Sequence, residues 1–191
     1  AATTSTQTAD TYDLIVRNGT LYDGTGTAGR RADVGIRGDR VASVGDLSGA
    51  RATTEIDAGG KAVAPGFINV LSWANESLIA DGRAMSDLKQ GVTLEIMGEG
   101  ESGGPLNDAM KADVLKHQGD IKYAIDWTTL GEFLDSLVRR GISLNVASFV
   151  GATSVRVHVL GEDDRDPTPA ELLQMQQLVR QAMREGALGV A

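Results

Sequence analysis

The segment Ala62-Val63-Ala64-Pro65-Gly66-Phe67-Ile68-Asn69-Val70-Leu71 decides the fold, because it is mostly apolar along its length. A strand that is buried on both faces has this pattern, and such strands are typical of parallel sheets covered by helices. Two further buried strands are expected at Val92–Met97 and Ile142–Val150, and a fourth opens at Ala187–Ala191. The chain therefore carries the strands of a parallel sheet.

Helical patterns lie between these strands. Three segments have suitable capping residues or terminal glycines: Asn75–Gln90, Thr129–Gly141 and Thr168–Gly186. The last is the clearest, since Thr168, Pro169 and Glu171 suit its N-cap, N1 and N3 positions. Strands that alternate with helices predict an α/β fold built from βαβ units.

The N-terminal third has a different pattern. Short β-like segments are separated by glycine turns about every eight to twelve residues, which is typical of a small sandwich. We therefore expect a flexible leader at residues 1–11, part of a small β-sandwich domain at 12–60, and the parallel sheet at 61–191.

Composition excludes several classes of partner and site. The 191 residues have a formal net charge of −8 and no run of Lys or Arg, which argues against nucleic acid, because phosphate binding needs a cationic surface. The absence of cysteine excludes disulfides and thiolate metal ligands within the chain. No apolar run approaches the roughly 18 residues of a membrane span. The start at Ala1-Ala2 resembles the product of signal-peptide cleavage and favours a periplasmic or secreted protein, with a shortened sequence as the alternative.

Several motifs resemble those of the amidohydrolase superfamily, and of its N-acyl-D-amino-acid deacylase branch. The superfamily resemblance rests on Tyr12–Gly24, Ala64–Val70 and Gly91-Val92-Thr93, and the narrower one on Asn145–Gly151 and Glu185–Val190. The resemblance implies a small β domain followed by the first half of a (β/α)8 TIM-like barrel, completed by a second chain or a C-terminal part. It also implies an amide hydrolase that acts on N-acyl or D-configured amino-acid derivatives or peptides.

The chain departs from the family at the positions of the metal ligands. The family's Asp-x-His-x-His corresponds here to Asn69, Leu71 and Trp73, and its metal-binding Cys corresponds to Gly100. Ala152 stands where the family has a polar His. Leu and Trp offer no lone pair to zinc, which binds N, S or O donors. We therefore expect no metal cofactor, with zinc held only through ligands outside this chain as the alternative.

The resemblance places the active site at the C-terminal ends of the barrel strands. The predicted catalytic residues are Glu99, Glu101 and Ser72, and the predicted substrate-binding residues are Asn69, Trp73, Thr153, Arg156 and His158. A pair of carboxylates on a glycine-rich loop can bind an amine or act as general acid and base. A solvated acidic loop and a structural salt bridge of Arg156 are the plainer alternatives.

Glu95 and His158 each have a functional and a structural interpretation. Glu95 lies inside a strand expected to be buried, so it is either a site residue or half of a structural ion pair. We expect Arg156 and His158 to share one strand face. A structural role for this histidine is also open.

The end of the chain suggests a mechanism. Ala191 lies inside a strand that has barely begun, so we expect it to be a processing site where a precursor is cut into two chains. The resemblance to the deacylase branch, in which small hydroxyl residues typically follow this segment, implies a Ser or Thr at the head of the second chain. Such a residue is an N-terminal nucleophile that needs no metal. The rival hypotheses are a metal-dependent D-aminoacylase with downstream ligands and a non-catalytic pseudoenzyme that binds an amino acid.

Overall fold

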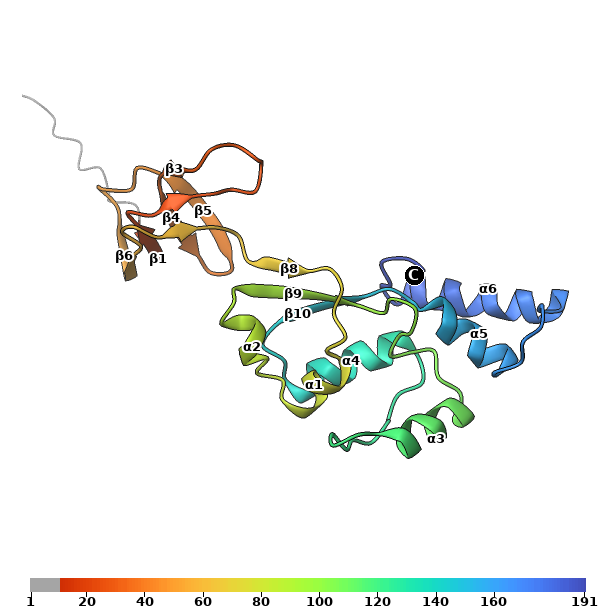
Figure 1. Ribbon diagram of the computed structural model, residues 1–191. Helices are drawn as coiled ribbons and strands as arrows, with labels where there is room; N and C mark the ends of the chain where they lie inside the picture. The colour runs from red at the N-terminus through yellow and green to blue at the C-terminus, as the bar shows by residue number, and fades with distance from the viewer. Residues whose placement is uncertain (1–10) are drawn as a thin grey trace, which may run out of the picture. The chain divides into compact units, whose positions relative to one another are not determined.

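The computed structural model describes residues 11–191, which divide into a first unit that ends at Pro65 and a second unit, Gly66–Ala191 (Figure 1). Residues 1–10 of the expected leader lie outside the described residues, whereas Thr11 already opens a strand. The boundary between the units falls later than the expected one at Lys61, because Ala62–Val63 still pairs with a strand of the first unit. None of the helices in the described part is both long and apolar enough to span a membrane.

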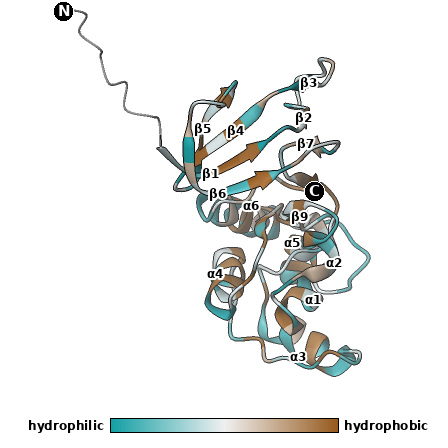
Figure 2. Ribbon diagram, turned by 90° about the vertical axis from the view of Figure 1, so that its left-hand side faces the viewer, coloured by the Kyte–Doolittle hydropathy of each residue, from teal (hydrophilic) through white to brown (hydrophobic). Residues whose placement is uncertain are grey.

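The first unit consists of two small sheets. One has the strand order β5-β4-β1-β6 and the other the order β3-β2-β7. The strands are β1 (Thr11–Arg17), β2 (Thr20–Leu21), β3 (Arg30–Arg31), β4 (Asp33–Arg37), β5 (Arg40–Gly45), β6 (Arg51–Asp57) and β7 (Ala62–Val63). Tyr12, Ile15 and Leu47 form the buried cluster of this unit, and Figure 2 shows the hydrophobic residues along β1.

The second unit contains the expected parallel sheet. β8 (Phe67–Asn69), β9 (Val92–Met97) and β10 (Asn145–Ser148) pair in parallel in the order β10-β9-β8. A parallel bridge between Val150 and Val190 continues this order and marks the predicted fourth strand. The prediction of successive parallel strands is confirmed.

The helices of this unit are α1 (Asn75–Ala80), α2 (Met85–Leu88), α3 (Asp108–His117), α4 (Leu130–Arg140), α5 (Ala152–Leu160) and α6 (Pro169–Arg184). Both predicted capping boxes are present, Thr129 with Glu132 at α4 and Thr168 with Glu171 at α6. Side chains of the strands and helices share one core, which includes Leu78, Met97, Trp127, Leu130, Phe133, Leu137, Val155 and Ala182.

Two expectations about local structure are wrong, and one helix was missed. The helix expected at Asn75–Gln90 is broken into α1 and α2, because Asp81 is extended and Ala84 is left-handed at the start of α2. No helix was expected at α3, whose polar sequence has no apolar stripe. The expected strand face of Arg156 and His158 is part of α5, since tertiary contacts at the helix start override the strand preference of its valines.

Candidate functional site

A tight loop follows β9 and carries the two predicted acidic residues. Gly98 and Gly100 adopt positive φ angles of 92° and 70°, a conformation that favours glycine. The first turn of α5 fixes the next part of this loop. The Thr153 amide donates to the Gly100 carbonyl at 3.0 Å, and the Gly151 amide donates to Ser102 Oγ at 2.9 Å. Glu101 is therefore held between two anchored neighbours.

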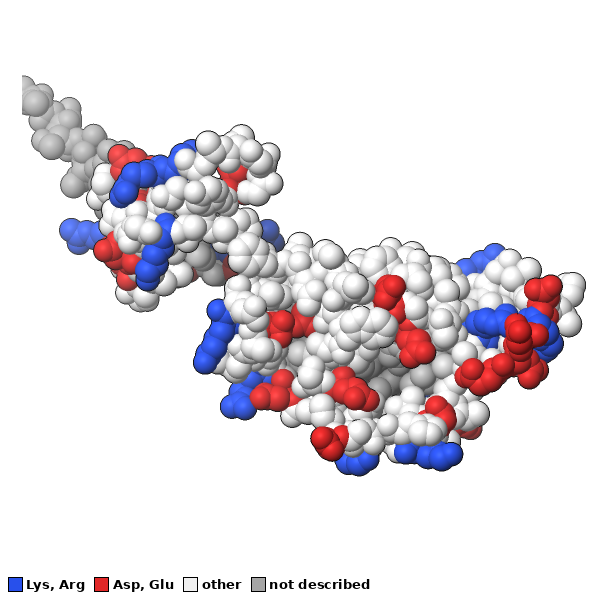
Figure 3. Space-filling model, in the orientation of Figure 1, with Lys and Arg blue, Asp and Glu red and all other residues white. Residues whose placement is uncertain are grey.

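Two cavities meet at this loop. The larger cavity, of about 820 Å³, is lined by residues of the loop, α3 and α5, among them Glu101, Asn107, Asp113, Thr153 and His158. The aromatic cavity, of about 290 Å³, is lined by Trp73, Asn75, Glu76, Ile79, Glu101, Ser102, Gly103, Leu106, Val114, Tyr123, Ile125, Trp127 and Phe133. On the face drawn in Figure 3, Asp and Glu side chains border a hollow in the second unit.

The structure brings four of the predicted site residues to these cavities. Glu101 lines both, Trp73 lines the aromatic cavity, and Thr153 and His158 line the larger one. Burial lowers the pKa of His158, because a protonated ring loses hydration there. The imidazole is therefore neutral at neutral pH and can accept a hydrogen bond.

Asn69, Glu99 and Arg156 line neither cavity. The Asn69 side chain accepts from the Leu71 amide at 3.3 Å, and Glu99 is exposed. The roles predicted for Asn69 and Glu99 remain predictions.

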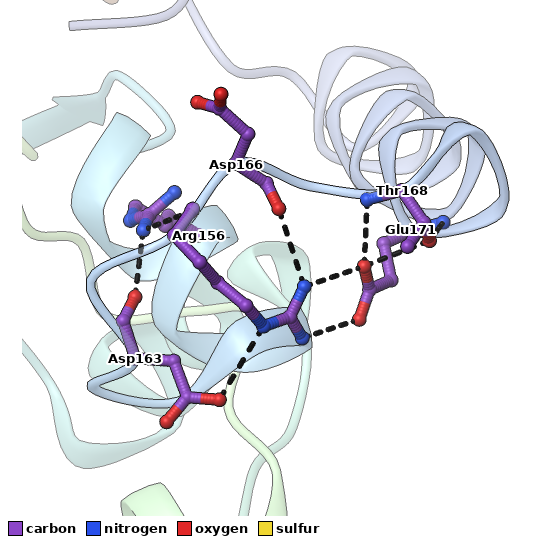
Figure 4. Close-up of polar contacts among 6 residues, drawn as sticks. Arg156, Asp163, Asp166, Thr168 and Glu171 are labelled. Carbon is purple, nitrogen blue, oxygen red and sulfur yellow. Dashed lines mark hydrogen bonds and ion pairs between the residues drawn. The ribbon is translucent and has the colours of Figure 1, made fainter.

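The Arg156 guanidinium has backbone partners in the loop between α5 and α6. It donates to the Asp163 and Arg165 carbonyls, each at 2.8 Å, so it supports this loop (Figure 4). Arg165 in turn forms an ion pair with Glu171 at 2.7 Å, which lowers the pKa of Glu171 to about 2. The substrate contact predicted for Arg156 competes with its structural contacts.

Ser72 and Glu95 form a buried pair beneath the strand ends. Ser72 Oγ donates to Glu95 Oε2 at 2.6 Å, and the two residues are 6% and 1% exposed. Glu95 Oε1 has no hydrogen-bond partner among the described residues. The Ala74 amide donates to Ser72 Oγ at 3.2 Å, so the pair ties the chain that leaves β8 to β9. This geometry gives Ser72 a structural contact, and its predicted role as a nucleophile stays a prediction.

Sequence reasoning predicted Trp73 and Glu101 but missed the other aromatic residues of the aromatic cavity. Tyr123 and Trp127 stack with ring centroids 6.3 Å apart and an interplanar angle of 5°. The Tyr123 hydroxyl donates to Glu76 Oε1 at 3.1 Å, and the buried Oδ1 of Asn75 has no partner. The available signal was the spacing of Tyr123, Ile125 and Trp127, large apolar residues at every second position in the connection before α4.

The Gly151→Ala variant is expected to lose about 2 kcal/mol of stability, as overpacking against backbone does. A Cβ at this position would overlap the Gly100 carbonyl and come within 2.7 Å of Glu101 Cα. Urea unfolding measures the loss. The matched control is Gly119→Ala, whose Cβ has no neighbour within 4 Å. Equal stability of the two variants would show that the loop does not rest on α5.

No family model matches the chain. It is 36% identical over 184 residues to a D-aminoacylase of Alcaligenes xylosoxydans xylosoxydans, a match that covers 94% of this chain and 37% of that protein. The chain superposes on a crystal structure of D-aminoacylase, described as defining a subset of amidohydrolases, with a TM-score of 0.80. The sequences are 36% identical, and the match covers 94% of this chain and 38% of the D-aminoacylase. The structure of an N-acyl-D-glutamate deacylase from Bordetella bronchiseptica gives a TM-score of 0.82 at 30% identity. This match covers 95% of the present chain and 38% of the deacylase.

These relatives of the chain are D-aminoacylases and deacylases, which are amide hydrolases. The resemblance in the sequence motifs therefore agrees with both comparisons. The chain spans little more than a third of the length of these D-aminoacylase relatives.

The expectation of no metal cofactor is wrong for this group of proteins. One solved D-aminoacylase structure concerns a binuclear metal centre, and the N-acyl-D-glutamate deacylase is complexed with zinc and a phosphonate inhibitor. The metal-free route through an N-terminal Ser or Thr loses its basis with this finding. Cleavage after Ala191 has no support in the relatives either.

Proposed function

We propose that the full-length protein containing these 191 residues hydrolyses the amide bond of N-acyl-D-amino acids. The observation that carries this proposal is the 36% identity to a D-aminoacylase over 94% of the chain. The N-acyl-D-glutamate and N-acyl-D-aspartate deacylases, at 34% and 33% identity, support the same substrate class.

We further propose that the parallel sheet is the first half of a (β/α)8 barrel. The strand order β10-β9-β8 and the bridge at Val190 support this, because successive barrel strands pair in parallel. Phe67 and Ile68 of the edge strand β8 are 60% and 54% exposed, which suits an edge that further strands cover. The active site then lies where the strands end, beside Trp73 and Glu101.

Glu101 is the described carboxylate best placed to act on the substrate. In amide hydrolysis the oxygen of water adds to the carbonyl carbon, the C–N bond breaks, and the nitrogen takes up a proton. A carboxyl group within reach of that nitrogen can hold its N–H and deliver the proton. Glu101 lines both cavities on a loop that α5 anchors, so it borders the space in which a substrate would bind.

The described residues do not fit a metal centre of the kind that the relatives hold. Within residues 11–191, no three His, Cys, Asp or Glu side chains gather to suit a metal ion. Leu71 and Trp73, which follow β8, have no donor for zinc. We therefore favour a metal-dependent enzyme whose ligands come from the part of the relatives' length that these residues do not span.

The test is turnover by the full-length protein of N-acetyl-D-amino acids beside their L-enantiomers, followed by release of free amine. We expect turnover of D-substrates with a kcat/KM at least about tenfold above that of the L-forms, a gap of about 1.4 kcal/mol in transition-state binding. Treatment with a chelator is expected to abolish turnover, and zinc to restore it. Saturable binding of the D-substrate without turnover would instead identify a binding protein.

A further inference from the structure

The aromatic cavity has walls that suit a flat or apolar body. Trp127 and Phe133 are buried in its floor, with ring centroids 5.3 Å apart, and Tyr123 stacks on Trp127. Trp73 lines the cavity but is 64% exposed, so it lies at the open side. The volume of about 290 Å³ falls just below the range of sites for drug-sized ligands, so its occupant is a small molecule.

The polar groups of this cavity favour a hydrogen-bond donor. Glu76 and Glu101 contribute carboxylates, and the buried Oδ1 of Asn75 is an acceptor without a partner. A buried acceptor of this kind is costly until a donor reaches it. No Lys, Arg or His is among the described residues that line the cavity. The cavity therefore presents acceptors and negative charge with no opposing cation.

Tyr123 does not supply the missing donor. Burial, with the neighbouring Glu76, raises the pKa of Tyr123 to about 12, so its hydroxyl keeps its proton at neutral pH. The hydroxyl already donates a hydrogen bond to Glu76 Oε1 at 3.1 Å. The indole N–H of Trp127 is used as well, since it donates to the Gly103 carbonyl at 2.7 Å.

We propose that the aromatic cavity binds a small organic ammonium ion with an apolar or aromatic body. The ammonium group lies near the Glu76 and Glu101 carboxylates, which both line the cavity. Its body packs against Trp73, Tyr123 and Trp127, whose ring faces attract a cation. This inference rests on the site proposed for amide hydrolysis, because both use Trp73 and Glu101. Binding is measured without turnover, so the two proposals can fail separately.

The test is equilibrium binding of 2-phenylethylammonium, followed by tryptophan fluorescence of the full-length protein. Both tryptophans of the 191 residues line the cavity, so their emission reports on it. The fluorescence change of Trp73→Phe is subtracted from that of the wild type. The difference is the contribution of Trp73, free of tryptophans outside the 191 residues. We expect a dissociation constant on the order of 1–10 mM, which suits a probe of this size. The neutral analogue 2-phenylethanol is expected to bind at least about tenfold more weakly.

Two variants locate the ammonium group. Glu101→Gln removes the charge and is expected to weaken binding of the ammonium about tenfold, with no effect on 2-phenylethanol. Glu76→Gln removes the second carboxylate of the cavity and is expected to weaken it about threefold. The matched control is Asp135→Asn, which removes an exposed carboxylate of α4 outside the cavity and should leave affinity within about twofold. Equal affinity for ammonium and alcohol, or no saturable binding, would overturn the proposal.

Discussion

Replacing Ser72 by alanine is expected to destabilise the second unit by about 3 kcal/mol. The variant removes the 2.6 Å hydrogen bond to Glu95 Oε2, and Glu95 Oε1 already lacks a partner in the described chain. A buried carboxyl group is then left without any donor, and this costs more than the lost bond itself. The contact of the Ala74 amide with Ser72 Oγ disappears as well. Urea unfolding of variant and wild type measures the difference.

The double variant Ser72→Ala/Glu95→Leu separates the two causes of this loss. With both polar partners replaced by apolar groups, no buried oxygen is left unpaired, and stability is expected within about 1 kcal/mol of wild type. A double variant at least as unstable as Ser72→Ala would show that the unpaired Glu95 carboxyl group does not cause the loss of stability. A loss below about 1 kcal/mol in Ser72→Ala alone would show that water or a further group already satisfies Glu95.

Phe133→Ala is expected to cost about 4 kcal/mol. The ring is 1% exposed at the centre of the shared core and packs against Trp127 at a centroid distance of 5.3 Å. Truncation to Ala loses the burial of the ring and leaves a cavity that the rigid strands cannot fill. Val138→Ala on the same helix is the matched control, because Val138 is 68% exposed and should change stability by at most about 0.5 kcal/mol. Similar losses of stability in both variants would show that Phe133 does not lie at the centre of the core.

The sequence predicted those elements whose pattern is local. Val92–Met97 is mostly apolar, and Thr129 and Thr168 begin helices with their own capping boxes, so these elements are recognisable without tertiary contacts. The order of the parallel strands follows from their alternation with helices. Short crossover connections place successive strands beside one another.

The misses depend on contacts between distant segments. Val155, Val157 and Val159 favour a strand by themselves, but α5 forms because its first turn bonds to the loop after β9. The pairing of Ser72 with Glu95 depends on the register of β8 against β9, which the sequence does not specify. The metal expectation failed because it used only donors within the chain, which spans 37% of the D-aminoacylase relative.

The measurement that tests the account most directly is the kcat/KM of Glu101→Gln in the full-length protein, with the N-acyl-D-amino acid that the wild type hydrolyses fastest. If amide hydrolysis takes place where β8 and β9 end, loss of this carboxyl group is expected to lower kcat/KM about 10²-fold, as loss of a proton-transfer group does. Unchanged far-UV circular dichroism and thermal stability show that the variant is folded. A kcat/KM within about twofold of wild type in that folded variant would place the chemistry elsewhere and contradict the site described for this chain.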